Sequence, residues 1–212
     1  MKIRGIIFDL DGVLVFTDKF HYLAWKELAD SLKIPFDESM NNRLRGVSRM
    51  ESLEIILEND RGVVRSETEK KMLAEKKNRI YQRLLEQMTP ADVSDEVRNT
   101  LTRLREKGYL LAVGSSSKNA KYIMRQTKIT EYFDAVSDGT NIKKSKPDPE
   151  VFLKAAFFLD LKPEECIVVE DADAGIAAAK TGNMEAIGIG ANVMDKRMDY
   201  HIQNMNELLK IF

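Results

Sequence analysis

The sequence predicts an α/β protein, with a Rossmann-like parallel sheet as its core and an all-helical cap domain inserted after the first strand. Short runs of β-branched and other apolar residues alternate with helical patterns over most of the chain, as in parallel strands joined by crossover helices. From about residue 17 to 87 the pattern changes, and only helical stripes are found. A chain of 212 residues can bury one sizeable core and a smaller second domain.

Five short apolar runs are the predicted strands of the core. Each run is nearly continuous in apolar character, which suits a strand that is covered on both faces of the sheet. In chain order the predicted strands are residues 3–8, 109–113, 135–137, 166–170 and 186–189.

Helical patterns separate these strands. In the core, a stripe over residues 97–104 predicts a helix that Gly108 ends. Further along, Asp148 is the predicted N-cap and Pro149 the first residue of another helix. The stripes of the inserted block are Phe20, Ala24, Leu28 and Leu32; Leu53, Ile56 and Leu57; and Leu73, Ile80, Tyr81, Leu84 and Leu85.

These patterns also predict the domain boundaries. The core is expected to comprise residues 1–15 and 90–212, and the cap domain residues 16–89. The chain would leave the core near residues 15–16 and return near residues 88–90.

Composition points to a small-molecule partner. The chain has 33 basic and 34 acidic residues and a formal charge of -1, so its total charge gives no indication of nucleic-acid or membrane binding. The single cysteine, Cys166, lies in an apolar run and is expected to be a buried thiol, which fits a reducing cytoplasm. The apolar N-terminal run stops at Asp9, so we expect no signal peptide, and no stretch is apolar enough to span a membrane. We expect a monomer.

Two pairs of acidic residues follow two of the predicted strands. Asp9 and Asp11 come after the first strand, where residues two apart in extended chain face the same way, and Gly12 permits a sharp exit. Such a pair alone can also be a turn or a helix cap. Glu170 and Asp171 follow another apolar strand, however, and the carboxyl ends of parallel strands meet at one edge of the sheet.

Converging carboxylates require a cation. Oxygen ligands suit Mg²⁺, whereas two histidines and one cysteine far apart in the sequence argue against zinc. The predicted metal ligands are Asp9, Asp11, Glu170 and Asp171.

A phosphate site is predicted at the ends of two other strands. Residues 115–119, with the sequence Ser-Ser-Ser-Lys-Asn, offer hydroxyls and amides at the start of a helix, where an anion can bind, although a serine-rich turn can also be a plain loop with an N-cap. Lys146 lies at the next strand-to-helix junction, where Pro147 and Pro149 stiffen the segment, although an isolated lysine there could be a surface residue. The order of all four segments at four strand ends favours a site.

Asp9-Leu10-Asp11-Gly12, Ser115, Lys146 and Glu170-Asp171 resemble the four motifs of the haloacid dehalogenase-like superfamily of phosphotransferases. The resemblance spans nearly the whole chain. Residues 20–26 and 45–53 also resemble the cap of the β-phosphoglucomutase family, and residues 76–78, 89–93 and 115–119 extend that likeness. The cap segments are more specific than the core motifs, which phosphatases share.

The resemblance implies interconversion of β-glucose 1-phosphate and glucose 6-phosphate through β-glucose 1,6-bisphosphate. Asp9 would attack phosphorus and form an aspartyl phosphate, and Asp11 would act as acid and base toward the sugar oxygens. Ser115 and Lys146 would hold the phosphoryl oxygens, and Asp171, with Glu170 as ligand or neighbour, would bind Mg²⁺.

The resemblance also implies a set of substrate contacts. Arg49 suits a bidentate grip on a second phosphate, although it could also be an exposed charge at a helix start. His21 and Lys77 would help to align Asp11, while Trp25 could be core or face the sugar. The implied substrate-binding residues are His21, Trp25, Gly46, Val47, Arg49, Ser52, Lys77, Ser116, Ser117, Lys118 and Asn119.

The chain departs from the family pattern at three positions. Phe16 stands where the family usually has an acid, and Gly114 and Ser116 stand where alanine is common. None is the expected nucleophile, acid or metal ligand. The alternative function is a Mg²⁺-dependent phosphatase, or another phosphomutase, acting on a small sugar phosphate. A non-catalytic protein on this scaffold would be expected to lack Asp9, Asp11, Lys146 or Asp171, and all four are present.

Overall fold

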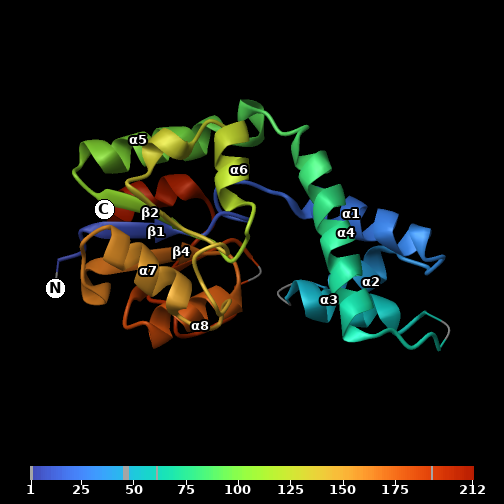
Figure 1. Ribbon diagram of the computed structural model, residues 1–212. Coiled ribbons are helices and arrows are strands. Elements are labelled where there is room, and N and C mark those ends of the chain that lie inside the picture. Colours follow the sequence, from blue (N-terminus) through green and yellow to red (C-terminus); the bar gives the residue numbers. More distant parts are fainter. Residues whose placement is uncertain (1, 45–47, 61, 192) are drawn as a thin grey trace. The chain divides into compact units, whose positions relative to one another are not determined.

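The computed structural model describes residues 2–44, 48–60, 62–191 and 193–212 (Figure 1). The chain forms two compact units. Met1–Phe16 and Met88–Phe212 make up the first, here called the sheet unit, and Thr17–Gln87 make up the second, here called the helical unit.

The sheet unit contains a parallel sheet with the strand order β3-β2-β1-β4-β5-β6. The predicted α/β class with a parallel sheet is confirmed. The first strand occupies the centre, where Ile7 pairs with Ala112 on one side and Val168 on the other. The strands are β1 Gly5–Phe8, β2 Leu110–Gly114, β3 Ala135–Ser137, β4 Cys166–Glu170, β5 Glu185–Ile189 and β6 Tyr200–Ile202.

The sequence patterns missed β6. This strand pairs with β5 at the edge of the sheet, and only Ile202 of its three residues is buried. Tyr200 and His201 are exposed, so the strand has no apolar run to reveal it.

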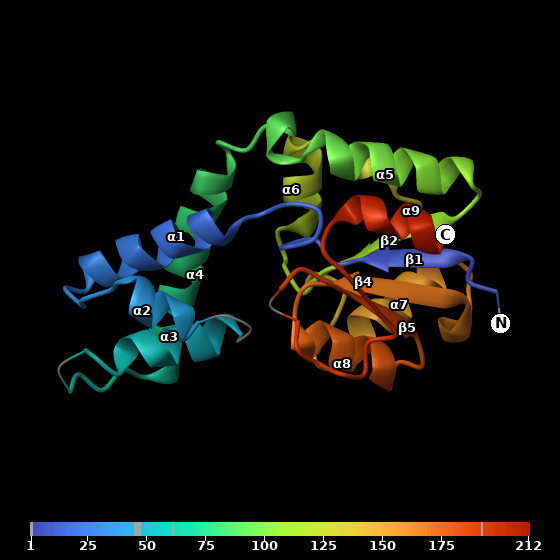
Figure 2. The ribbon, with the colours of Figure 1, turned by 180° about the vertical axis from the view of Figure 1, so that it is seen from behind.

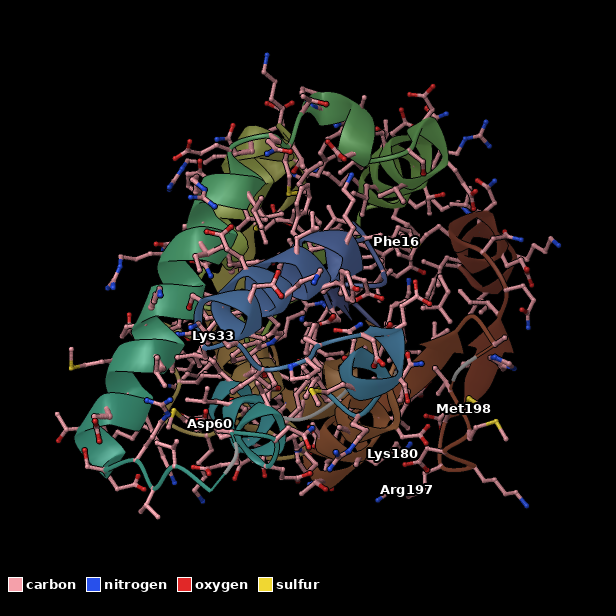
Figure 3. All side chains as sticks on the ribbon, turned by 90° about the vertical axis from the view of Figure 1, so that its right-hand side faces the viewer. Phe16, Lys33, Asp60, Lys180, Arg197 and Met198 are labelled. Carbon is pink, nitrogen blue, oxygen red and sulfur yellow. The ribbon has the colours of Figure 1, made fainter. Side chains whose placement is uncertain are left out.

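Helices cover both faces of this sheet. Figure 1 and the reverse view in Figure 2 show α5 and α9 over one face and α7 and α8 over the other. The helices of the sheet unit are α5 Asp95–Glu106, α6 Ala120–Gln126, α7 Glu150–Phe158, α8 Asp173–Thr181 and α9 Leu208–Ile211, with short 3-10 turns at η1 Pro90–Asp92, η2 Thr130–Tyr132, η3 Pro163–Glu165 and η4 Met205–Glu207.

The core beneath α7 and α8 explains the continuous apolar strands. Ile7 and Val168 from the sheet pack in one buried cluster with Phe152 of α7 and Ile176 of α8. Cys166 belongs to the same cluster and is fully buried, as its apolar surroundings in the sequence predicted. Burial raises the pKa of the Cys166 thiol to about 12, so the group is an inert part of the core.

The predicted start of α7 is wrong by one residue. Pro149 is the N-cap residue and Glu150 is the first helical residue. Asp148 still acts at this helix start, because its carboxylate accepts a hydrogen bond from the Glu150 amide at 3.0 Å.

The helical unit contains α1 Asp18–Ser31, α2 Glu38–Asn42, α3 Arg49–Leu57 and α4 Glu67–Leu85. Capping boxes begin α3, at Ser48 and Glu51, and α4, at Ser66 and Glu69. The apolar stripes form the core of the unit, with Phe20, Ala24, Leu28, Leu53, Ile56, Ile80, Tyr81 and Leu85 buried. None of the helices in the described parts of either unit is both long and apolar enough to cross a bilayer.

Candidate active site

Three carboxylates converge at the carboxyl ends of β1 and β4. These strands are neighbours with Phe8 opposite Val169, so Asp9 follows β1 where β4 ends in Glu170. The Asp9 amide donates to the Val169 carbonyl at 2.9 Å and fixes the start of the loop. One oxygen from each of Asp9, Glu170 and Asp171 lies within 4.8 Å of the others.

Asp11 is not part of this group of three. It lies in a tight loop, half-buried, where it forms an isolated bridge with Val15. The Gly12 amide donates to the Val15 carbonyl at 2.7 Å, and Gly12 has a φ of 87°. The chain therefore bends at Leu10 and turns sharply at Gly12, so Asp11 lies in a loop and not in the extended strand.

Lys146 lies against two of the three acids. Its Nζ donates to Asp9 Oδ1 and to Glu170 Oε2, the second at 2.7 Å, and its side chain is only 11% exposed. Burial disfavours the ammonium, but the charges of Asp9 and Glu170 outweigh this cost and hold the pKa of Lys146 above its ordinary range. Lys146 therefore stays a cation at any working pH.

The acidic cluster has more negative charge than Lys146 can balance. Burial raises the pKa of Asp171 to about 6, and the charge of Asp9 adds to the effect. Burial also raises the pKa of Glu170, against the opposing influence of Lys146. A divalent cation among these oxygens would offset that cost, and a set of oxygen donors with few protein ligands is the pattern that Mg²⁺ prefers. Asp9, Glu170 and Asp171 thus fit a Mg²⁺ site.

Two glycines make room for the acids. A Cβ atom at Gly175, in the first turn of α8, would lie 2.0 Å from the Glu170 carboxyl carbon. A Cβ atom at Gly12 would lie 2.0 Å from Asp171 Oδ2. Both contacts are far inside van der Waals distance, so the carboxylates can occupy these positions only because both residues lack a side chain.

The serine-rich loop follows β2, the neighbour of β1 on its other side. Ser115 is buried, and its hydroxyl accepts the Ser117 amide at 3.1 Å. The Ser117 hydroxyl in turn accepts the Asn119 amide at 3.2 Å. Asn119 is buried, whereas Lys118 is exposed.

Ser116 links this loop to the lysine loop. Its hydroxyl accepts the Lys146 amide at 3.4 Å, so the structure brings together two segments that are thirty positions apart in the sequence. The neighbouring departure from the family pattern, Gly114, has a packing reason, because a Cβ atom there would lie 2.6 Å from the Phe152 ring.

Sequence patterns missed the segment that supports the serine loop. The Gly139 amide donates to the Ser117 carbonyl at 3.1 Å, and a Cβ atom at Gly139 would lie 2.4 Å from the Ser116 carbonyl oxygen. The adjacent Asp138 is fully buried and lies 3.7 Å from Lys121 Nζ. An Asp-Gly pair directly after the strand 135–137 was the available signal.

His21 and Lys77 meet in the helical unit. Lys77 is 3% exposed, and its Nζ lies 2.9 Å from His21 Nδ1. The same Nζ lies 4.7 Å from the ring centres of Trp25 and Tyr81, and His21 stacks on Tyr81 at 4.2 Å. Burial, and then the charge of Lys77, hold the pKa of His21 well below its ordinary value. His21 is therefore neutral, and its Nδ1 accepts a hydrogen bond from the Lys77 ammonium.

The other candidates in the helical unit have defined surroundings. Arg49 donates to Asn78 Oδ1 at 3.1 Å and lies 3.7 Å from Glu75, with 29% of its side chain exposed. Trp25 and Ser52 are each 4% exposed. The predicted contacts Gly46 and Val47 lie outside the described residues.

Comparison with known proteins identifies the family. A family model described as haloacid dehalogenase-like hydrolase matches residues 3–183. The chain belongs to this family. It is therefore an enzyme of the haloacid dehalogenase superfamily, as the four motifs indicated.

Several proteins of known name are similar to the chain over most of their length. The chain is 44% identical to the beta-phosphoglucomutase of Bacillus subtilis strain 168, over 88% of this chain and 83% of that protein. The crystal structure of beta-phosphoglucomutase from Clostridium difficile matches with a TM-score of 0.85 and 37% identity, over 97% of this chain and 93% of that one. A phosphorylated carbohydrates phosphatase of Thermotoga maritima is 32% identical, over 87% of this chain and 83% of that protein.

The glycine beside Glu170 gives a test of the acidic cluster. We expect Gly175→Ala to push the Glu170 carboxylate away and to lower Mg²⁺ affinity and turnover by roughly 10- to 100-fold, the size usual for a disturbed support of a metal ligand. Gly182→Ala, at the other end of α8, is the matched control, because a Cβ atom there has no neighbour closer than 3.3 Å. Equal activity of the two variants would contradict this view of the site.

The neutral state of His21 predicts a pH dependence. Because the pKa of His21 is lowered by folding, the unfolded chain binds the extra proton, and the helical unit loses stability as pH falls below about 6.5, the ordinary histidine pKa. Trp25 is the only tryptophan and lies in the helical unit, so urea unfolding followed by its fluorescence at pH 7.5 and 5.5 measures the change.

His21→Gln should reduce that loss of stability, and His201→Gln, which changes the other histidine of the chain, should retain it. The same pH dependence in wild type and His21→Gln would rule out this role for His21.

Proposed function

We propose that the protein is a sugar phosphomutase that interconverts β-D-glucose 1-phosphate and D-glucose 6-phosphate through β-glucose 1,6-bisphosphate. The observation that carries the proposal is the 44% identity to a beta-phosphoglucomutase over most of both chains, in a protein whose Asp9, Lys146 and acidic pair lie in one cluster. The similarity in three dimensions to a second beta-phosphoglucomutase supports the same assignment.

Asp9 is the proposed nucleophile. One of its oxygens would attack phosphorus while the bond from phosphorus to the sugar oxygen breaks, which leaves an aspartyl phosphate. Its position supports this role, because it is 7% exposed at the end of a central strand and its backbone is fixed by the bond to Val169. The covalent step divides one transfer into two easier ones.

Asp11 is the proposed acid and base. In the first half-reaction it would protonate the departing sugar oxygen, and in the second it would take the proton from the sugar hydroxyl that attacks the aspartyl phosphate. Its separation from the three-carboxylate group supports this division of labour, since a carboxylate committed to a metal exchanges protons poorly.

Lys146 and Ser115 are proposed to bind the transferring phosphoryl group. The Lys146 ammonium, already in contact with Asp9, is positioned to balance charge that develops on the phosphoryl oxygens. Ser115, at the end of the neighbouring strand, would add a hydroxyl donor. Asp9, Glu170 and Asp171 are the proposed ligands of Mg²⁺. When bound, the cation would offset the negative charge of these carboxylates and of the phosphoryl group.

Further residues are proposed to contact the sugar phosphate or to support the residues that do. Arg49 is suited to a second phosphate because its guanidinium is partly exposed and presents a planar set of N–H donors that can bind an anion in a bidentate way. Ser117 and Asn119 are proposed to share that role, and His21 with Lys77 to support Asp11. Trp25 is buried within the helical unit, which favours a packing role over contact with a sugar.

A phosphatase acting on a small sugar phosphate is the second candidate. It is favoured by the 32% identity to a phosphorylated carbohydrates phosphatase over 87% of this chain. The two functions share the nucleophile, the lysine and the acidic cluster, and they differ in whether a sugar hydroxyl or water attacks the aspartyl phosphate.

A pair of assays on one sample separates these candidates. With β-glucose 1-phosphate, Mg²⁺ and a trace of bisphosphate primer, we expect glucose 6-phosphate to form without matching release of free phosphate. Asp9→Asn should lower the rate by on the order of 10³-fold or more, because it removes the nucleophile. Asp160→Asn, an exposed position in the same unit, is the control and should leave the rate unchanged. Phosphate release without isomerisation would contradict the mutase and favour the phosphatase.

A further inference from the structure

Glu150 holds the segment that delivers Lys146 to the site. It is the first residue of α7, and its Oε2 accepts the amides of both Lys143 and Lys144 at 2.9 Å. Its Oε1 lies 3.0 Å from Lys154 Nζ, one helical turn further along α7. One carboxylate therefore binds two backbone donors and an ammonium.

These bonds close the lysine segment on itself. At the far end of the segment, Asp148 accepts the Glu150 amide at 3.0 Å and donates its own amide to the Ser145 carbonyl at 3.1 Å. Lys146 lies inside this closed loop, two residues beyond the Lys144 amide. Only Ser145 separates the bound Lys144 amide from Lys146.

Packing contributes little to holding residues 143–145. Lys143, Lys144 and Ser145 are exposed, and an open surface cavity of about 500 Å³ lies alongside, lined in part by Lys143, Lys144 and Glu150. By contrast, Val151 and Phe152, the next residues of α7, are fully buried. Glu150 therefore connects an exposed loop to a helix that is fixed in the core.

The ionic state of Glu150 suits this role. The amides of Lys144 and Lys143, followed by Lys154, lower the pKa of Glu150 to about 2. Its carboxylate is consequently charged throughout the pH range in which an enzyme works, and charge-assisted hydrogen bonds are stronger than neutral ones.

We propose that Glu150 is a positioning residue for phosphoryl transfer, which seats the Lys146 ammonium against Asp9 and Glu170 by holding residues 143–146. The inference rests on the proposed role of Lys146 in phosphoryl transfer. It adds a residue that contacts neither phosphate nor metal and acts through the backbone.

The expected effect is on turnover more than on binding. A displaced Lys146 no longer meets the charge that develops at the phosphoryl group, and a misplacement of about 1 Å can cost roughly 100-fold in rate. The proposed sugar contacts lie on other segments, so KM should change little while kcat falls.

The test compares Glu150→Ala and Glu150→Gln with Glu165→Ala. Glu165 is a matched control, because it also accepts a backbone amide, from Lys162 at 3.0 Å, also pairs with a cation, Arg4, and has the same 22% side-chain exposure. It precedes β4, at the end of the sheet opposite to the acidic cluster. We expect kcat to fall by roughly 100-fold in Glu150→Ala, by less in Glu150→Gln, which retains one acceptor oxygen, and not in Glu165→Ala.

Hydrogen exchange of the peptide that contains residues 141–147 supplies a readout without turnover. It should become faster in Glu150→Ala and stay unchanged in Glu165→Ala. Both kinetic comparisons use whichever product the wild-type enzyme forms, glucose 6-phosphate or free phosphate. If wild type releases only phosphate, the proposed mutase function fails while Glu150 is still tested.

An equal kcat in Glu150→Ala and Glu165→Ala, whether both match wild type or both are lowered, would overturn the role of Glu150.

Discussion

The convergence of Asp9, Glu170 and Asp171 within 4.8 Å is the constraint on which the rest of the site depends. Like charges held this close in a largely buried place are costly, and the raised pKa values of Glu170 and Asp171 express that cost. Two features offset this cost: the positive charge of Lys146, and the room that glycines leave for the carboxylates. The Lys146 ammonium contacts Asp9 and Glu170, while Gly12 leaves room for Asp171 and Gly175 leaves room for Glu170.

The support continues outward from the acids through the backbone. Ser116 binds the Lys146 amide, and Gly139 allows the segment after β3 to pack on the serine loop. Glu150 then ties the lysine segment to α7, whose next residues are buried in the core. A reactive cluster at the ends of short strands is thus held by hydrogen bonds from neighbouring loops, and these loops are fixed in turn by the apolar packing of the sheet.

The sequence was informative where a single local pattern determines the structure. Apolar runs predicted five of the six strands in the described parts of the chain. Acids at the ends of strands 3–8 and 166–170 predicted the cluster of Asp9, Glu170 and Asp171, because both strands end at the same edge of the sheet. Sequence patterns did not predict features that depend on which residues lie close together in space. Nothing local in Asp11 shows that the chain turns before it, and nothing in Glu150 shows that its carboxylate reaches back to the 143–144 amides. The edge strand β6 has too little buried surface to leave a pattern.

The central proposal is that Asp9, Glu170 and Asp171 bind a divalent cation. Calorimetric titration of the protein with Mg²⁺ tests it most directly, alongside Asp171→Asn and an exposed control, Asp160→Asn. We expect one Mg²⁺ bound per wild-type chain, the same binding in the control, and an affinity lower by at least about tenfold in Asp171→Asn. Absence of Mg²⁺ binding to wild type, or equal affinity in all three proteins, would contradict it.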